Sequence, residues 1–287
     1  MEIRYASTPK AVKHYTTAEL REEFLVQGLF EEDTQKMVYS HIDRIIIGSI
    51  VPVKAPMELS GAEDLKAEYF LERREMGVLN LGGTGTIIVD DKEYTVRNRE
   101  VLYVGMGAKK VVFASDDAAN PARYYLNSAP AHKTYPTVLV KLDGEPEEGC
   151  VVVKPENKVA LGNKEDSNER VICKYIVPDQ VQSCQLVMGI TQLKPGSVWN
   201  SMPCHTHDRR MEVYLYCDLP EDAFVMHYMG EPQETRHIVI RNEEAVISPS
   251  WSIHAGSGTR AYSFVWGMVG ENQTFGDMDG VAMKDLM

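Results

Sequence analysis

Short runs of alternating apolar and polar residues, separated by turn residues, cover most of this chain. Between residues 69 and 127 these runs are interrupted by turns rich in Gly and Asp, at residues 82–85 and 90–92. This spacing predicts short strands joined by hairpins. A second series of similar runs begins near residue 170 and continues to residue 268. The pattern therefore predicts an all-β protein.

Helices are expected only near the N-terminus. Thr16 and Glu19 have the three-residue spacing of a capping box, which predicts a helix that continues to about Gln27. A second short helix is predicted near residues 34–38. The apolar run at residues 44–53 then returns to the pattern of a buried strand. The expected fold is all-β with a few short helices.

Two parts of the chain resemble each other. The matching pairs of segments are 97–110 with 241–254, and 73–76 with 209–212. Self-similarity of this kind predicts two copies of one structural unit. In this alignment Lys110 corresponds to His254, and Met76 corresponds to Glu212.

Three histidines and one glutamate in the second copy have the spacing of metal ligands. His205 and His207 project to the same side, because alternate residues of a strand share a face. Glu212 begins the next predicted strand, and His254 follows a turn that starts at Pro249. Imidazole nitrogens combined with a carboxylate oxygen suit a divalent transition metal. We therefore expect one metal ion in the C-terminal unit and none in the N-terminal unit.

A polar stretch rich in Gly, Pro, Glu and Lys marks the predicted connection between the two copies. The predicted domains are residues 1–145 and residues 170–287, joined by residues 146–169. The tail from residue 270 to residue 287 has no periodic apolar residues, so it is expected to be a surface extension at a subunit contact.

Composition narrows the function classes. The net charge of −12 over 287 residues, with no basic patch, argues against nucleic acid or an anionic membrane as a partner. No apolar run is long enough to cross a bilayer, and the N-terminus lacks an apolar signal segment. Five cysteines without a Cys-x-x-Cys pair fit free thiols in a reducing compartment. The expected location is the cytoplasm.

The ligand spacing resembles the two motifs of the cupins, which implies two tandem cupin-like β-barrels (a bicupin) with the metal site in the C-terminal barrel. Longer strings resemble the 5-dehydro-4-deoxy-D-glucuronate isomerases, also named 4-deoxy-L-threo-5-hexosulose-uronate ketol-isomerases. These strings are residues 43–48, 80–83, 202–207, 209–214, 233–239, 247–254 and 266–273. The resemblance covers nearly the full length of the chain.

The resemblance implies an activity and a cofactor. Members interconvert 5-dehydro-4-deoxy-D-glucuronate and 3-deoxy-D-glycero-2,5-hexodiulosonate during the breakdown of pectin and other polyuronates. The expected partner is thus a small deoxy-uronate, and the expected assembly is a homohexamer. One zinc ion (Zn2+) per chain would be held by His205, His207, Glu212 and His254. Four protein ligands fit either a catalytic ion or a structural one, and the sequence leaves both roles open.

Other residues are candidates for catalysis and for binding of the substrate carboxylate. Tyr214 has the same strand parity as Glu212, so its hydroxyl is expected to face inward. His227 and His237 are candidates for acid–base groups near neutral pH. The candidate cations for the carboxylate are Arg170, Lys174 and Arg236.

Two other functions compete with the isomerase. Three histidines and a glutamate also suit iron or manganese, as in a metal-dependent cupin oxygenase or decarboxylase, which would consume oxygen or change the redox state of its metal. A non-catalytic uronate-binding cupin would bind the sugar without turnover. The fold alone does not separate the three, whereas the strings that resemble the isomerases favour the first.

Overall fold

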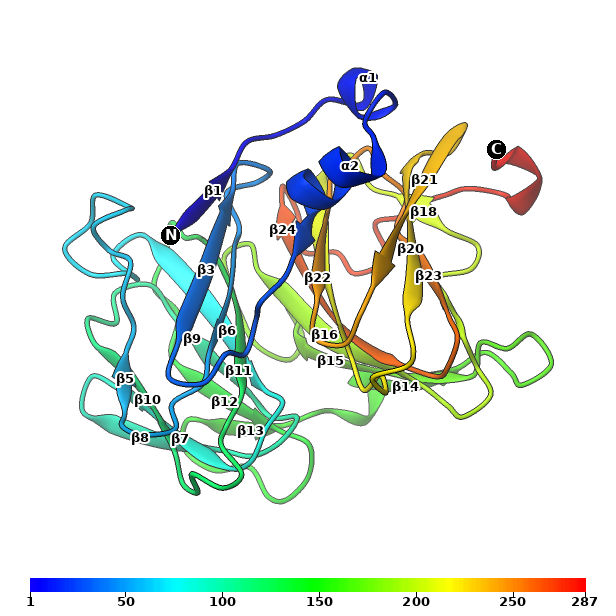
Figure 1. The fold of residues 1–287 in the computed structure, drawn as a ribbon. Coiled ribbons are helices and arrows are strands. Elements are labelled where there is room, and N and C mark those ends of the chain that lie inside the picture. The colour runs from blue at the N-terminus through cyan, green and yellow to red at the C-terminus, as the bar shows by residue number, and fades with distance from the viewer. The chain divides into compact units, whose positions relative to one another are not determined.

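The computed structural model describes residues 1–287 and consists almost entirely of β-strands (Figure 1), which confirms the predicted all-β fold. The helical elements are α1 (Pro9–Val12), α2 (Thr17–Phe24) and the 3-10 turns η1 (Pro155–Asn157) and η2 (Met283–Asp285). Thr16 and Glu19 form the predicted capping box at the start of α2. Neither α-helix has the length or the apolar sequence that a membrane-spanning helix needs.

The chain forms two compact units that each combine separate segments. Unit 1 comprises Met1–Arg4, Gly28–Lys154 and Tyr175–Val187, and unit 2 comprises Tyr5–Gln27, Pro155–Lys174 and Met188–Met287. In Figure 1, α1 and α2 (blue) lie beside the yellow and orange strands of unit 2. The N-terminal segment of residues 5–27 therefore belongs structurally to the C-terminal unit.

Unit 1 contains a large sheet and a small sheet. In spatial order the large sheet is β1 (Glu2–Arg4), β3 (Gln35–Ser40), β4 (Ile46–Ile50), β11 (Tyr124–Pro130), β6 (Arg74–Asn80), β9 (Val101–Val104), β12 (Val138–Lys141) and β13 (Cys150–Val152). The small sheet is β5 (Met57–Glu58), β10 (Val111–Ser115), β7 (Gly85–Val89) and β8 (Lys92–Val96). Leu102 of the large sheet and Phe113 of the small sheet belong to one apolar core.

The helix expected near residues 34–38 is wrong, because this segment belongs to β3. Met37 and Val38 are buried there, and the strand pairs with β1 on one side and with β4 on the other. The two neighbouring strands satisfy its backbone groups, so tertiary pairing outweighs the local preference.

Unit 2 repeats this architecture. Its large sheet is β14 (Lys158–Leu161), β15 (Arg170–Ile176), β16 (Val187–Leu193), β24 (Ser263–Gly270), β19 (Arg210–Cys217), β22 (Ala245–Ser248) and β2 (Leu25–Val26). A second sheet is β17 (Trp199–Asn200), β23 (Ala255–Gly258), β20 (Val225–Glu231) and β21 (Glu234–Ile240), and a short ribbon pairs β18 (His205–Thr206) with β25 (Asp279–Gly280).

The internal repeat is visible in the strand register. Met76 of β6 pairs with Val104 of β9 in unit 1. Glu212 of β19 pairs with Ser248 of β22 in unit 2, at the positions that the sequence alignment makes equivalent. Met76 lies in the apolar core, whereas Lys110, which corresponds to His254, is exposed. The equivalent positions of unit 1 therefore carry none of the ligand side chains of unit 2.

Candidate metal centre

Three neighbouring stretches of unit 2 bring the four predicted ligands together. His205 lies on β18, and His207 follows one residue after that strand. Glu212 lies on β19, and His254 immediately precedes β23. All four side chains are buried, and their ligand atoms lie within 4.8 Å of one another. The spacing in the sequence thus becomes a compact group of three imidazoles and one carboxylate.

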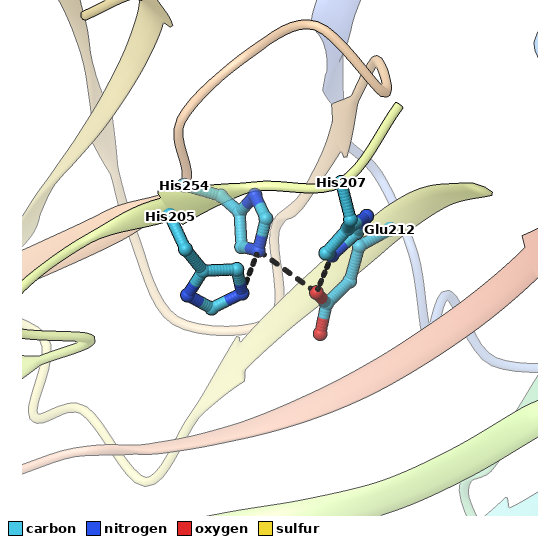
Figure 2. Close-up of side chains that lie close together, drawn as sticks. All are labelled: His205, His207, Glu212 and His254. Carbon is cyan, nitrogen blue, oxygen red and sulfur yellow. Dashed lines mark hydrogen bonds and ion pairs between the residues drawn. The ribbon is translucent and has the colours of Figure 1, made fainter. Parts of the chain in front are cut away.

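Figure 2 shows these four side chains pointing toward a common centre. The Oε2 atom of Glu212 lies 2.9 Å from Nε2 of His254 and 3.2 Å from Nε2 of His207. The Nε2 atoms of His254 and His205 are 3.1 Å apart. Lone pairs that converge at such distances are favourable only around a proton or a cation, so the donor set fits a divalent transition metal.

Backbone carbonyls orient two of the imidazoles. The Nδ1 atom of His207 lies 2.8 Å from the carbonyl oxygen of Arg210, and Nδ1 of His254 lies 3.4 Å from that of Ser252. An Nδ1–H that donates to a carbonyl leaves the lone pair on Nε2, which is the atom that faces the group. The surroundings therefore favour the tautomer that a metal requires.

Burial and mutual charge set the ionisation of the group. Burial, with a smaller contribution from the neighbouring His254, lowers the pKa of His205 to about 3. Burial opposes ionisation of Glu212, but the imidazoles of His254 and His207 outweigh it and hold the pKa of this carboxyl below its ordinary value. The site thus combines a neutral His205 with a carboxylate, the protonation states that metal binding needs.

A cavity of about 240 Å³ opens beside the group. His205 and Glu212 line it, so the ligands reach its interior from one side. Arg170 of β15 and Tyr214 of β19 also line it. The cavity thus offers ligand atoms, a hydroxyl and a guanidinium to one small molecule.

Tyr214 lies where strand parity predicts. Its side chain is 3% exposed, and its ring meets that of His254 edge-on, with 5.5 Å between centroids. Burial is the main cause that raises the pKa of Tyr214 well above its ordinary value. The hydroxyl therefore remains protonated and can donate a hydrogen bond to an oxygen in the cavity.

The two other candidate acid–base residues do not line the cavity. His227 of β20 is fully buried, and its Nδ1 lies 2.8 Å from the hydroxyl of Tyr216. His237 of β21 is exposed. The structure thus places His227 within the barrel interior and His237 at the surface.

Among the candidate cations, only Arg170 lines the cavity. The Nη1 of Arg170 donates to the carbonyl oxygen of Asn168 at 2.8 Å, whereas its buried Nε has no partner. The ammonium of Lys174 lies over the ring of Phe275, 4.4 Å from its centroid. Arg236 donates to backbone carbonyls of the N-terminal segment, those of Val12, Lys13 and Tyr15.

The tail has no buried residue, in keeping with the expected surface extension, but the expectation did not include a part in the pocket. Phe275 and Met278 line the cavity together with His205 and Glu212. Phe275 packs on Trp266, with 5.3 Å between ring centroids. The only signal in the sequence is that two large apolar residues interrupt a polar segment, which is too weak to assign them to a pocket.

Substitution of His227 by glutamine is expected to make the free energy of unfolding less dependent on pH in the acid range. Burial lowers the pKa of His227 to about 3 in the folded protein. The unfolded chain therefore takes up this proton first, and the free energy of unfolding decreases as pH falls from about 6.5 toward 3. Between pH 7 and pH 4 this decrease should be smaller in His227→Gln by up to about 3 kcal/mol.

Denaturant unfolding of metal-free protein at the two pH values measures this difference. Substitution of the exposed His132 by glutamine is the matched control and should leave the pH dependence unchanged. If the free energy of unfolding decreased equally between pH 7 and pH 4 in His227→Gln and in the wild type, the assignment of a neutral buried imidazole would be contradicted.

Comparisons with known proteins agree with this fold and this site. The profile of the KduI/IolB family matches residues 24–283. A protein of Lachnoclostridium phytofermentans, named 4-deoxy-L-threo-5-hexosulose-uronate ketol-isomerase, is 63% identical over 286 residues, which cover 100% of both chains.

Two solved structures have the same fold. An IolB-like protein from Salmonella typhimurium LT2 superposes with a TM-score of 0.68 at 12% identity, over 90% of this chain and 96% of that chain. A variant of Bacillus subtilis oxalate decarboxylase gives a TM-score of 0.56 at 10% identity, over 89% and 79%. These likenesses confirm the predicted pair of cupin-like barrels. Together with the family profile and the full-length relative, they show that the chain belongs to the KduI/IolB family.

Proposed function

We propose that this protein is a 4-deoxy-L-threo-5-hexosulose-uronate ketol-isomerase of pectin breakdown, and that its four-residue group holds one zinc ion. The full-length relative with this name supports the activity. One observation carries the site: two members of the ligand group, His205 and Glu212, line the same cavity as Arg170. An α-hydroxyaldehyde and a carboxylate, the two ends of the substrate, each find a complementary partner there.

The reaction moves a carbonyl group from C1 to C2 of an open-chain uronate. A proton must leave C2, another must reach C1, and negative charge develops on the oxygens between these steps. When bound at the ligand group, a divalent ion would polarise the carbonyl and stabilise that charge as a Lewis acid. The remaining tasks belong to the chain: binding, orientation, acceptance of the C2 proton by a base and donation of a proton to C1.

Tyr214 and Arg170 are suited to binding and orientation of the substrate. The hydroxyl of Tyr214 is a protonated donor beside the ligands, so it can bind an oxygen of the reacting carbons. Arg170 has a buried Nε without a partner and is half-buried at the cavity wall. A guanidinium offers two parallel donors to a carboxylate, which would fix the substrate with its aldehyde end toward the ligands.

The family resemblance implies the assembly, and the five free cysteines favour the location. We expect a homohexamer in the cytoplasm that acts on a small uronate. Zinc is the preferred ion, because three imidazoles and one carboxylate form the nitrogen-rich, four-coordinate set that zinc favours. Light scattering tests the assembly, and elemental analysis that finds one zinc ion per chain tests the metal.

An anaerobic assay in deuterium oxide tests the reaction itself. Metal-loaded protein is expected to form the diketo acid without oxygen or a nicotinamide, and the product should carry one deuterium at the former aldehyde carbon. This label arises because the proton that leaves C2 exchanges with solvent before C1 is protonated. Metal-free protein that remains folded is the matched control and should be nearly inactive.

The assay also separates the competing functions. A product that forms only when oxygen is present would favour the cupin oxygenase and reject the isomerase. Uronate binding without turnover would favour a non-catalytic cupin. Unlabelled product at full rate would retain the isomerase but replace proton transfer by a hydride shift.

A further inference from the structure

The C-terminal tail of unit 2 is attached directly to the segment that carries the ligands. Gly280 of β25 pairs with His205 of β18, and the backbone N–H of Val281 donates to the carbonyl of Cys204 at 3.0 Å. We call residues 271–281 the strap. Its backbone therefore runs beside the first ligand of the proposed metal site.

Arg209, which lies between His207 and Glu212 in the sequence, forms ion pairs with two carboxylates of the strap. Its guanidinium donates to both carboxylate oxygens of Asp277 at 2.5–3.1 Å, and to Asp279 at 2.8 Å. Asn272 also donates to Asp277, at 2.6 Å. The bonds from Arg209 and Asn272 hold the pKa of the Asp277 carboxyl below its ordinary value. One arginine thus holds two strap carboxylates that would otherwise repel each other.

The next residue, Arg210, binds the backbone of the strap from the buried side. Arg210 is 0% exposed, and its guanidinium donates to the carbonyls of Thr274, Phe275 and Asp277 at 2.7–3.3 Å. Its own carbonyl accepts the bond from His207 that orients this ligand. Arg209 and Arg210 therefore connect the strap with the ligand segment from two directions.

The strap reaches the cavity through two apolar side chains. Phe275 contacts both the ring of Trp266 and the ammonium of Lys174, and it lines the cavity. Met278 also lines the cavity and is 41% exposed, so it lies at the mouth. Displacement of the strap would remove this part of the wall and open the cavity to solvent.

We propose that the strap forms the outer wall of the substrate pocket and that Arg209 is the positioning residue that holds it closed. The inference rests on the proposed function, because it assigns the cavity to the substrate. The side-chain hydrogen bonds and ion pairs of Arg209 are with the strap, and Arg209 does not line the cavity. Its side chain is 34% exposed, so replacement leaves the core intact, unlike replacement of the buried Arg210.

Arg209→Met in the full-length, zinc-loaded protein tests this assignment. The expected result is a KM for the uronate raised about tenfold with kcat changed less than threefold, because a loosened wall weakens binding while the reacting groups stay in place. Zinc content should remain that of the wild type. Amide hydrogen exchange at residues 279–281 should become faster, and a chelator should remove zinc about tenfold faster, since the strap no longer covers the ligands.

Controls separate positioning from general stability. Arg241→Met removes another exposed arginine of unit 2, away from the cavity, and should leave KM, exchange and zinc release unchanged. Arg209→Lys keeps the positive charge, so its KM should lie between that of the wild type and that of Arg209→Met. In a double-mutant cycle, Asp277→Asn should raise KM less in the Arg209→Met background than in the wild type, because the bond between Arg209 and Asp277 is already lost there.

Two results would overturn the inference. An unchanged KM despite faster exchange in the strap would show that the strap does not bound the pocket. Unchanged exchange and zinc release would show that Arg209 does not hold it. If the wild-type protein fails to isomerise the uronate, the proposed function fails, whereas exchange and zinc release still decide whether Arg209 closes the strap.

Discussion

Replacement of His254 by alanine is expected to remove the metal and to lower kcat/KM for the uronate by roughly a thousandfold or more. His254 holds the centre of the group, since its Nε2 lies 2.9 Å from Oε2 of Glu212 and 3.1 Å from Nε2 of His205. Loss of one of four donors leaves an incomplete ligand set. Loss of a Lewis acid costs several kcal/mol of transition-state stabilisation, and about 4 kcal/mol corresponds to a thousandfold.

Elemental analysis and steady-state kinetics on the same preparation measure both effects. Substitution of the exposed His132 by alanine is the matched control, and thermal unfolding verifies that each variant is folded. If metal-free, folded His254→Ala kept the wild-type rate, the metal would have no catalytic role. Retention of the ion at wild-type affinity would instead remove His254 from the ligand set.

The sequence could predict that these four side chains cluster because three of them are close along the chain. His205 and His207 are two residues apart, and Glu212 follows five residues later on the next strand of the sequence. Strand parity places the two histidines on one face, and the structure keeps them together although β18 ends at Thr206. Only His254 required a longer inference, from the position of the turn at Pro249. The structure brings all four within 4.8 Å.

The internal repeat was also predictable, because equivalent positions have equivalent backbone contacts. The N–H of Arg97 donates to the carboxylate of Glu100 at 2.8 Å, and the N–H of Arg241 donates to that of Glu244 at 2.7 Å. A glutamate whose carboxylate accepts a bond from the N–H three residues before it is needed at the same place in both turns. The two segments therefore keep similar sequences, although the interiors of the two barrels differ.

Contacts between distant segments were not predictable. Arg21 donates to the carbonyl of Val239, 218 residues away, and this bond helps to hold the N-terminal segment on unit 2. Nothing in either local sequence specifies the other. The same holds for the strap, since the pairing of Arg209 with Asp277 spans 68 residues and both are ordinary surface residue types. Such contacts depend on the assembled barrel, which the pattern of strands does not position.

Replacement of Arg170 by methionine is expected to raise the KM for the uronate about a hundredfold while the metal remains bound. Arg170 lines the cavity, and its buried Nε has no partner within the protein. Hydrogen bonds between charged groups contribute about 1.5–3 kcal/mol each, so loss of a two-point contact costs roughly 3 kcal/mol, which is about a hundredfold. Methionine retains the apolar stem, so the wall of the cavity keeps its shape.

A substrate whose carboxylate is replaced by an amide makes this test specific. The wild-type enzyme should bind the amide about as poorly as Arg170→Met binds the uronate, and Arg170→Met should hardly distinguish the two compounds. Arg260→Met, which removes an exposed arginine of the same unit, should behave as the wild type. If Arg170→Met discriminates between uronate and amide as strongly as the wild type does, another cation binds the carboxylate. Lys174, whose ammonium already lies on the ring of Phe275 at the cavity wall, would then be the next residue to replace.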